Sequence, residues 1–174
     1  MTSPEYSRLV DIRQADGHQI ELAANEEERA ALATRFDLVR IDRLEARLSV
    51  TSQDQIVAAT GSMDADFVQR CAVSAEDMRV TVSEEISLRF VPERLDYKPD
   101  EEIEIDAEDC DDIEYSGTSF DLGEAVAQSL ALAIDPFATG PQAEQARSLL
   151  KSSEVSPFEA LASLKLPPEE KNND

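Results

Sequence analysis

Alternating apolar and polar positions mark the first half of this chain. In MRVTVSEEISLRFV, residues 78–91, six apolar side chains share one side: Met78, Val80, Val82, Ile86, Leu88 and Phe90. Alternation of this length is typical of an antiparallel strand with one buried face. Residues 39–50 and 55–73 alternate with one defect each, and they predict two more strands. We expect a bulge near Asp42–Arg43 in the first and, in the second, a change of the buried side at Gly61, from Ile56 and Ala58 to Met63 onward.

Two shorter alternating runs come before these strands. Residues 6–12 and 19–24 are separated by Asp16–Gly17, a dipeptide that suits positive φ. We therefore expect the two runs to pair as an opening hairpin.

Helical periodicity appears in four places. Residues 26–36 follow Asn25, which can cap a helix in a capping box with Glu28. Residues 122–135 follow a second box, Asp121 with Glu124, and Pro136 ends that run. This helix should cover the sheet with one face, formed by Leu122, Val126, Ser129, Leu130 and Ala133. Two weaker helices are expected at 141–151 and 156–165.

These elements predict an α+β fold: a mostly antiparallel β-sheet with helices packed on one side, a long acidic loop and a helical C-terminal tail. With 174 residues, the chain is long enough for one domain with its own core. We place that domain at residues 1–138, with an acidic mobile loop at 93–118 inside it. Residues 139–174 are expected to form a helical, partly flexible tail.

The charge of the chain restricts its partners. It holds 38 Asp and Glu against 16 Lys and Arg, a formal net charge of −22 at pH 7. Such a charge repels phosphate backbones and anionic lipid at long range and favours basic partners. We expect neither DNA nor a membrane as a partner, and any contact with RNA must be local. Since the N-terminus lacks the plan of a signal peptide, a cytoplasmic location is expected.

Residues 99–115 hold ten carboxylates and no Lys or Arg. One interpretation is a solvated loop that aids solubility. The other is a docking segment for a basic protein. In the second case the docking residues are Asp100, Glu101, Glu102, Glu104, Asp106, Glu108, Asp109, Asp111 and Asp112.

A set of arginines contrasts with this segment. If the strands pair as expected, Arg40, Arg43 and Arg47 face outward from one strand, Arg79 and Arg89 from another, and Arg70 from the strand between them. Together they predict a modest basic face that could touch RNA. Asp42, Glu45 and Glu85 interrupt it, so an ordinary mixed-charge surface is the alternative interpretation.

Motifs of catalysis and of metal binding are missing from the sequence. It has no glycine-rich phosphate loop and no nucleophile elbow, and its single histidine, His18, lies at a predicted turn. Cys71 and Cys110 cannot supply a four-ligand zinc site, and we expect both as reduced thiols, Cys71 as a small buried hydrophobe. We predict no enzyme activity, no metal and no cofactor.

Three features in sequence order resemble the YceD family, bacterial proteins named for large ribosomal RNA subunit accumulation. They are DFVQRCAVSAEDMRVTVSEEISLRFVPE, an acidic stretch, and FDLGEAVAQSLALAIDPF. The ending SPFEALASLK is similar to the tails of alphaproteobacterial members, and the likeness covers about Glu21 to Lys165. Other branches of the family have Cys-x-x-Cys where this chain has Cys71-Ala72-Val73-Ser74, so metal binding is not carried over.

The resemblance implies a non-enzymatic role in the synthesis, processing or stability of 23S rRNA of the large ribosomal subunit. In the main hypothesis, the arginine face binds rRNA, the acidic loop binds a basic ribosomal protein, or both contacts occur. The alternative is an acidic chaperone of assembly without direct RNA contact. A third hypothesis, an RNA-processing enzyme with Mg²⁺ held between Asp100 and Asp112, is disfavoured because catalytic metal sites need carboxylates on rigid elements.

Overall fold

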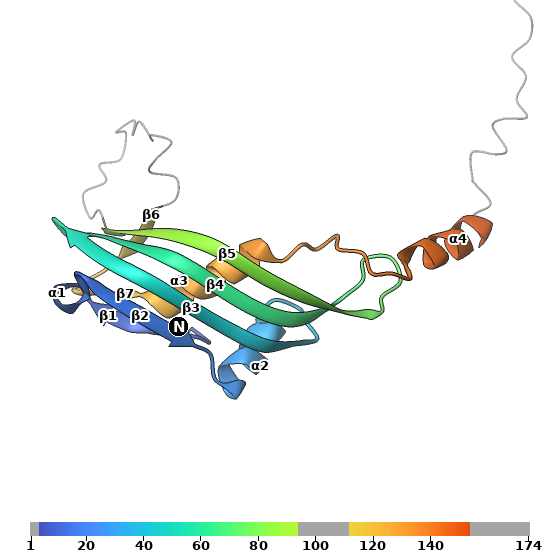
Figure 1. Cartoon of the computed structure of the whole chain (residues 1–174), viewed down its shortest axis with the longest axis horizontal. Helices are drawn as coiled ribbons and strands as arrows, with labels where there is room; N and C mark the ends of the chain where they lie inside the picture. The colour runs from blue at the N-terminus through green and yellow to red at the C-terminus, as the bar shows by residue number, and fades with distance from the viewer. Residues whose placement is uncertain (1–3, 94–111, 154–174) are drawn as a thin grey trace, which may run out of the picture.

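The main element of the fold is a five-stranded sheet in the order β2-β3-β4-β5-β6 (Figure 1). The computed structural model describes residues 4–93 and 112–153. Three long strands, β3 (Arg40–Gln53), β4 (Ile56–Arg70) and β5 (Asp77–Pro92), form consecutive antiparallel pairs. At the edges, β2 (His18–Ala23) pairs antiparallel with β3, and β6 (Asp112–Tyr115) pairs parallel with β5. A two-stranded sheet joins β1 (Leu9–Asp11) to β7 (Ser119–Asp121).

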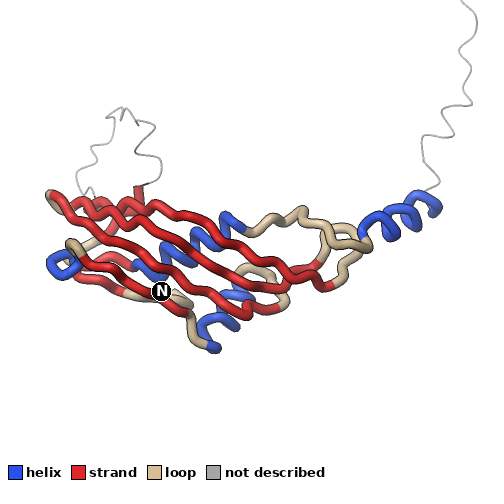
Figure 2. The backbone as a smooth tube through the Cα atoms, viewed as in Figure 1, coloured by secondary structure: helices blue, strands red, loops and turns tan. Residues whose placement is uncertain are grey.

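Helices lie on one side of the large sheet, which we call its inner face. In Figures 1 and 2 the long strands stand in front of α2 (Glu26–Arg35) and α3 (Leu122–Ala133). The short α1 (Ile12–Ala15) precedes β2, and α4 (Ala143–Ser153) lies at one end of the long axis. The predicted α+β class is confirmed. The expected helix at 156–165 lies outside the described residues.

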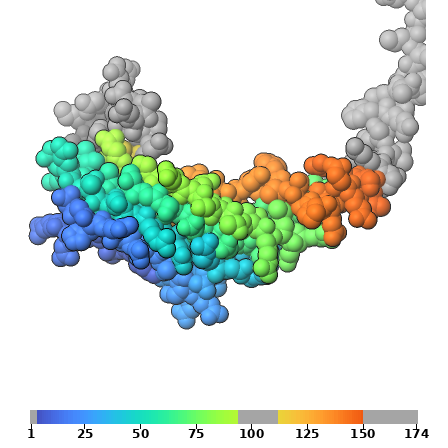
Figure 3. Space-filling view, in the orientation of Figure 1, coloured from blue at the N-terminus to red at the C-terminus, as the bar shows by residue number. Residues whose placement is uncertain are grey.

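One hydrophobic core fills the space between the inner face and the helices. Leu44, Leu48, Met63, Phe67 and Phe90 from the strands are at most 1% exposed and share a cluster with apolar residues of both helices, which include Leu32, Leu122, Val126 and Leu130. Burying each large apolar side chain contributes about 1.5–3 kcal/mol. The outer face of the sheet carries no described helix, as Figure 3 shows over β3, β4 and β5.

Several local predictions are confirmed. The register of β3 on β4 shifts between Ile41 and Arg43, which is the expected bulge. Asn25 and Glu28 form the expected capping box, with each side chain bonded to the backbone N–H of the other residue. The Asp121 side chain caps α3 by accepting from the Glu124 N–H, whereas the Glu124 carboxylate turns to Arg35 instead of completing a box.

The predicted opening hairpin is wrong. Gly17 has the expected positive φ of 72°, but the turn joins α1 to β2. β1 pairs with β7, more than a hundred residues further along the chain, in the register Leu9↔Asp121 to Asp11↔Ser119. β2 instead pairs along its whole length with β3, from His18↔Val50 to Ala23↔Glu45. The long strand offers β2 a full ladder of backbone hydrogen bonds, which the short β1 cannot match.

The predicted change of face at Gly61 is also wrong. Val57 and Ala59 are fully buried, on the same side as Met63 and Phe67, while Ile56 is 36% exposed. One apolar face therefore continues through the glycine. Gly61 is required for another reason, because a Cβ atom at this position would lie 1.9 Å from the carbonyl oxygen of Arg47. Glycine allows β3 and β4 to approach each other at this point.

We predict that Gly61→Ala lowers the free energy of unfolding by about 2–3 kcal/mol, because the added methyl group must push apart two paired strands. Chemical denaturation of the two proteins measures this. Ser62→Ala is the matched control: Ser62 is the next residue, its side chain belongs to the outer face, and its removal should change stability by less than about 0.5 kcal/mol. Equal stability of Gly61→Ala and wild type would contradict the close approach.

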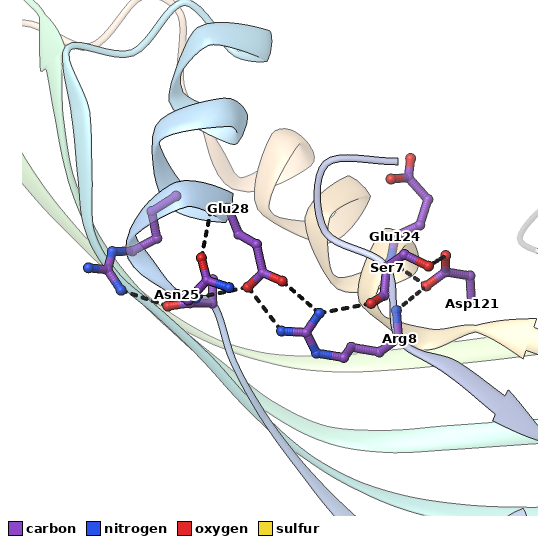
Figure 4. Close-up of polar contacts among 8 residues, drawn as sticks. Ser7, Arg8, Asn25, Glu28, Asp121 and Glu124 are labelled. Atoms are coloured by element: carbon purple, nitrogen blue, oxygen red, sulfur yellow. Dashed lines mark hydrogen bonds and ion pairs between the residues drawn. The ribbon is translucent and has the colours of Figure 1, made fainter. Parts of the chain in front are cut away.

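Residues 4–8 tie α2 to α3 through polar contacts (Figure 4). On the α3 side, Asp121 accepts from the Ser7 hydroxyl at 2.6 Å and from the Arg8 N–H at 2.8 Å. On the α2 side, the Arg8 guanidinium donates two hydrogen bonds to Glu28, at 2.7 and 2.9 Å. The hydrogen bonds from Arg8, and more weakly the one from the Asn25 backbone, lower the pKa of Glu28.

Tyr6 anchors this segment in the core. Its side chain is fully buried, and the Arg8 guanidinium lies 4.7 Å above the ring centroid. Burial raises the pKa of Tyr6 to about 12. The first described residues therefore belong to the packed domain.

We predict that Glu28→Gln lowers the free energy of unfolding by about 1–2 kcal/mol at neutral pH, because it weakens a paired, charge-assisted contact. The folded-state pKa of Glu28 lies below its ordinary value of 4.5. Its stabilising effect is therefore complete above that value and is lost as the pH falls through the lowered folded pKa. Urea denaturation between neutral pH and about pH 3 should show the two proteins converging. The exposed neighbour Glu27→Gln is the control, and an equal effect there would contradict the role of the Arg8 pair.

Candidate functional site

All six predicted arginines lie on the outer face of the large sheet. The registers place Arg43 opposite Asp66 and Arg47 opposite Ser62, with Leu44 and Ala46 pointing to the core between them. Arg79 and Arg89 alternate with the inward Val80, Leu88 and Phe90 of β5. The strand assignment and the shared face therefore agree with the sequence-based expectation.

Most of these arginines are held by carboxylates. The Arg43 Nε lies 2.7 Å from an Asp66 oxygen, and Thr81 donates to the other Asp66 oxygen at 2.7 Å. The pKa of Asp66 is lowered, first by the hydrogen bond from Arg43 and then by that from Thr81. Arg40 pairs with Asp42 at 2.8 Å, and Arg47 approaches Glu21 at 3.6 Å. A paired arginine presents little net charge to a phosphate group.

One part of the arginine face differs from the rest. Arg40 and Arg79 lie on either side of Val68, and Arg70 follows two residues later on β4. Val68 is only 2% exposed, although it points to the outer face. Among the described residues, Arg70 and Arg79 form no ion pair with a carboxylate. Arg70 and Arg79 are therefore the arginines of this face that no described carboxylate holds, and Arg40, which is paired with Asp42, lies beside them.

The acidic docking residues fall mostly outside the described residues: Asp100, Glu101, Glu102, Glu104, Asp106, Glu108, Asp109 and Asp111. Asp112 is described, and it is the first residue of β6. Its carboxylate lies 3.1 Å from the Arg89 guanidinium, and its side chain is 12% exposed. A residue expected to bind a basic partner and one expected to bind RNA are thus paired with each other.

A groove on the inner side of the molecule was not predicted. It has a volume of about 430 Å³ and runs between α3 and the pair β5–β6. Glu84, Ile86 and Leu88 line it from β5, Ile113 from β6, and Gln128 and Leu132 from α3. Leu132 is 89% exposed. Among the described helices, α3 alone lines this strip of the inner face.

The sequence held a partial signal for the groove. Ile86 was expected on the buried side of its strand, and the helix that follows Asp121 has an apolar residue, Leu132, outside its predicted buried face. The position of β6 had no such signal, because it depends on a parallel pairing with β5 across residues 94–111.

Other kinds of site find no support in the described part of the chain. No group of three His, Cys, Asp or Glu residues there is arranged to hold a metal ion. None of the described helices is long and apolar enough to span a bilayer.

Comparison with protein-family models matches residues 59–165 to the family described as "Large ribosomal RNA subunit accumulation protein YceD". The match covers more than half of the chain. The chain belongs to the YceD family. Neither the curated proteins nor the solved structures include a match to it. The family description links this YceD protein to large-subunit ribosomal RNA and names no reaction. The matched residues include both strands and the helix that line the groove.

In this YceD chain, Cys71 follows β4 in a tight turn. Cys71 is 3% exposed, which agrees with the expected burial. It does not join the main core, however, and its sulfur accepts from the Ser74 N–H at 3.4 Å and the Gly140 N–H at 3.3 Å. These donors and the Ser74 hydroxyl, which has the largest effect, lower the pKa of the thiol to about 6. The thiol is therefore more than a small hydrophobe.

We predict that Cys71 in a Cys110→Ser background ionises with a midpoint near the pKa of about 6, and that Ser74→Ala raises this midpoint. The ultraviolet absorbance of the thiolate measures it. Because the folded pKa lies below the ordinary 9.0, ionised Cys71 adds stability as the pH rises from about 6 to 9, and adds none below that range. A midpoint that Ser74→Ala leaves unchanged would contradict the role of the hydroxyl, and Cys71→Ser should abolish the transition.

Proposed function

We propose that this YceD protein is a non-enzymatic factor of ribosome biogenesis that supports the synthesis, processing or stability of 23S rRNA by binding a basic ribosomal protein. Direct contact with RNA is not part of this function. The protein acts in the cytoplasm, with residues 1–138 as its domain and residues 139–174 as its tail. The acidic segment that includes Asp100–Asp112 attracts the basic partner.

The pairing of the arginine face is the observation that carries this choice. Arg40, Arg43, Arg47 and Arg89 each lie within 4 Å of a carboxylate, at the distances given above. A phosphate group would have to displace these carboxylates against a net charge of −22. When the partner is a cationic protein, the same negative charge accelerates association and makes the free energy of binding more favourable.

A local RNA contact is the second candidate, and the arrangement around Val68 favours it. Arg70 and Arg79 carry no described ion pair there, and Arg40 lies beside them. Three arginines supply only a few phosphate contacts, so this binding would be weak at physiological salt.

The two candidates are separated by titrating the full-length protein against 23S rRNA fragments and, separately, against purified basic large-subunit ribosomal proteins over a salt series. We predict saturable binding to at least one ribosomal protein, weaker at high salt, and no saturable binding to RNA. RNA incubated with the protein and Mg²⁺ should stay intact, since no catalytic role is proposed.

Arg70→Ala/Arg79→Ala is the informative variant for the RNA arm. The control, Arg13→Ala/Arg147→Ala, removes the same charge from the helices α1 and α4, outside the strands of the sheet. Saturable RNA binding that the first variant loses and the control keeps would replace the proposal with the second candidate. Absence of binding to every ribosomal protein would refute the proposal.

A further inference from the structure

The groove between α3 and β5–β6 presents apolar side chains that no described segment covers. Ile86 and Ile113 are partly buried at its floor and pack against the core. Leu132 stands at its edge, 89% exposed. One exposed leucine is ordinary, but a leucine beside two half-buried isoleucines in a concave strip offers area that a partner can remove from water.

The size of the groove limits its occupant. About 430 Å³ lies at the lower end of the range of small-ligand pockets, roughly 300–1,000 Å³. The groove lies between one helix and two strands, and its volume has room for one or two large apolar side chains. A short extended segment of protein fits this shape.

The charge around the groove selects among such segments. Among the described residues, the charged ones that line it are Glu84 and Asp112, and none is a lysine or an arginine. Asp112 is paired with Arg89, whereas Glu84 forms no ion pair with a described residue. The two strands of its floor are joined by residues 94–111, whose sequence holds nine acids and two basic residues. A cation is therefore favoured at Glu84.

We propose that this groove binds an extended, lysine- or arginine-rich segment of a protein, which inserts one large apolar side chain between Ile86, Ile113 and Leu132. Cations that flank that side chain face Glu84, and the net charge of −22 attracts them. This inference rests on the proposed function, in which the partner is a basic ribosomal protein, and it assigns the place where that partner binds.

Other occupants fit the charges less well. A second copy of the chain brings another −22, and RNA brings phosphates; both are repelled by Glu84 and its surroundings. Residues 154–174 of the same chain carry more acids than basic residues. A basic segment is the one occupant that gains from both the apolar floor and the charge.

The test uses the full-length protein and a short lysine-rich peptide with one central leucine, labelled for fluorescence anisotropy. Leu132→Arg should weaken binding about tenfold, because it replaces an apolar contact with a like charge; its exposure means that the fold is not disturbed. Leu9→Arg is its control, since Leu9 is 72% exposed and does not line the groove. Replacing the leucine of the peptide with serine should weaken binding to wild type by a similar factor.

Variants of two neighbouring glutamates distinguish binding in the groove from attraction by the overall charge of the protein. Glu84 lines the groove, and Glu85, the next residue of β5, belongs to the outer face. Glu84→Lys and Glu85→Lys change the net charge equally. We predict a loss of binding several-fold greater for Glu84→Lys, whereas equal losses would mean that the peptide is held by the overall charge alone and would overturn the inference.

The same variants should also be tested with any basic ribosomal protein that binds in the titration described under the proposed function. This test distinguishes failure of the proposed function from failure of the groove assignment. If no ribosomal protein binds wild type, the proposed function fails. If one binds wild type and Leu132→Arg equally well, the proposed function stands and the groove assignment is wrong. A concentration-dependent dimer of wild type that Leu132→Arg disrupts, seen by sedimentation, would assign the groove to a second copy and would also overturn the inference.

Discussion

The burial of one long apolar sheet face under α2 and α3 is the constraint on which this structure depends. β3, β4 and β5 present a continuous row of buried side chains toward α3, and Gly61 allows the strands to approach closely enough to keep that row unbroken. α3 is shorter than the strands it covers. Residues 4–8, held by Asp121 and Glu28, fix the position of its first turn relative to α2. The strip beside Ile86 and Ile113 that no described segment covers follows from this geometry.

The two faces of the sheet consequently differ in what they can bind. On the outer face, charges of both signs stand opposite each other in register, and they neutralise each other over short distances. On the inner side, the groove combines apolar side chains with the carboxylate of Glu84, which forms no ion pair with a described residue. For a strongly acidic protein, a site of this second kind adds specificity to an attraction that the net charge already provides.

Membership of the YceD family connects this chain to large-subunit ribosomal RNA. The charge distribution of the chain bears on which component of the large subunit it binds. Ribosomal proteins are exposed to non-specific association before they reach RNA, since they are cationic. An acidic domain that holds an extended basic segment would protect the segment until RNA competes for it. Under this view the protein influences the accumulation of rRNA through the supply of a protein component.

The sequence by itself determined the long strands, the helices α2 and α3, their N-terminal caps and the faces of most of these strands. The alternation in residues 78–91, the bulge at Asp42–Arg43, and the caps Asn25 and Asp121 depend on residues close together in the chain, and a local pattern records them. The six arginines were placed on the correct face for the same reason. The structural role of Gly61 could not be predicted from neighbouring residues in the sequence, because the carbonyl group that excludes a Cβ atom there belongs to Arg47 on another strand.

Only the tertiary structure decided which strands pair and which charges meet. β1 pairs with β7 across most of the chain, and the carboxylates that hold Arg43 and Arg89 come from β4 and β6. The groove likewise requires the parallel placement of β6 beside β5 and the length of α3 relative to both. These features depend on register between distant segments. That register is set by the shared burial of their apolar sides, which no single segment encodes.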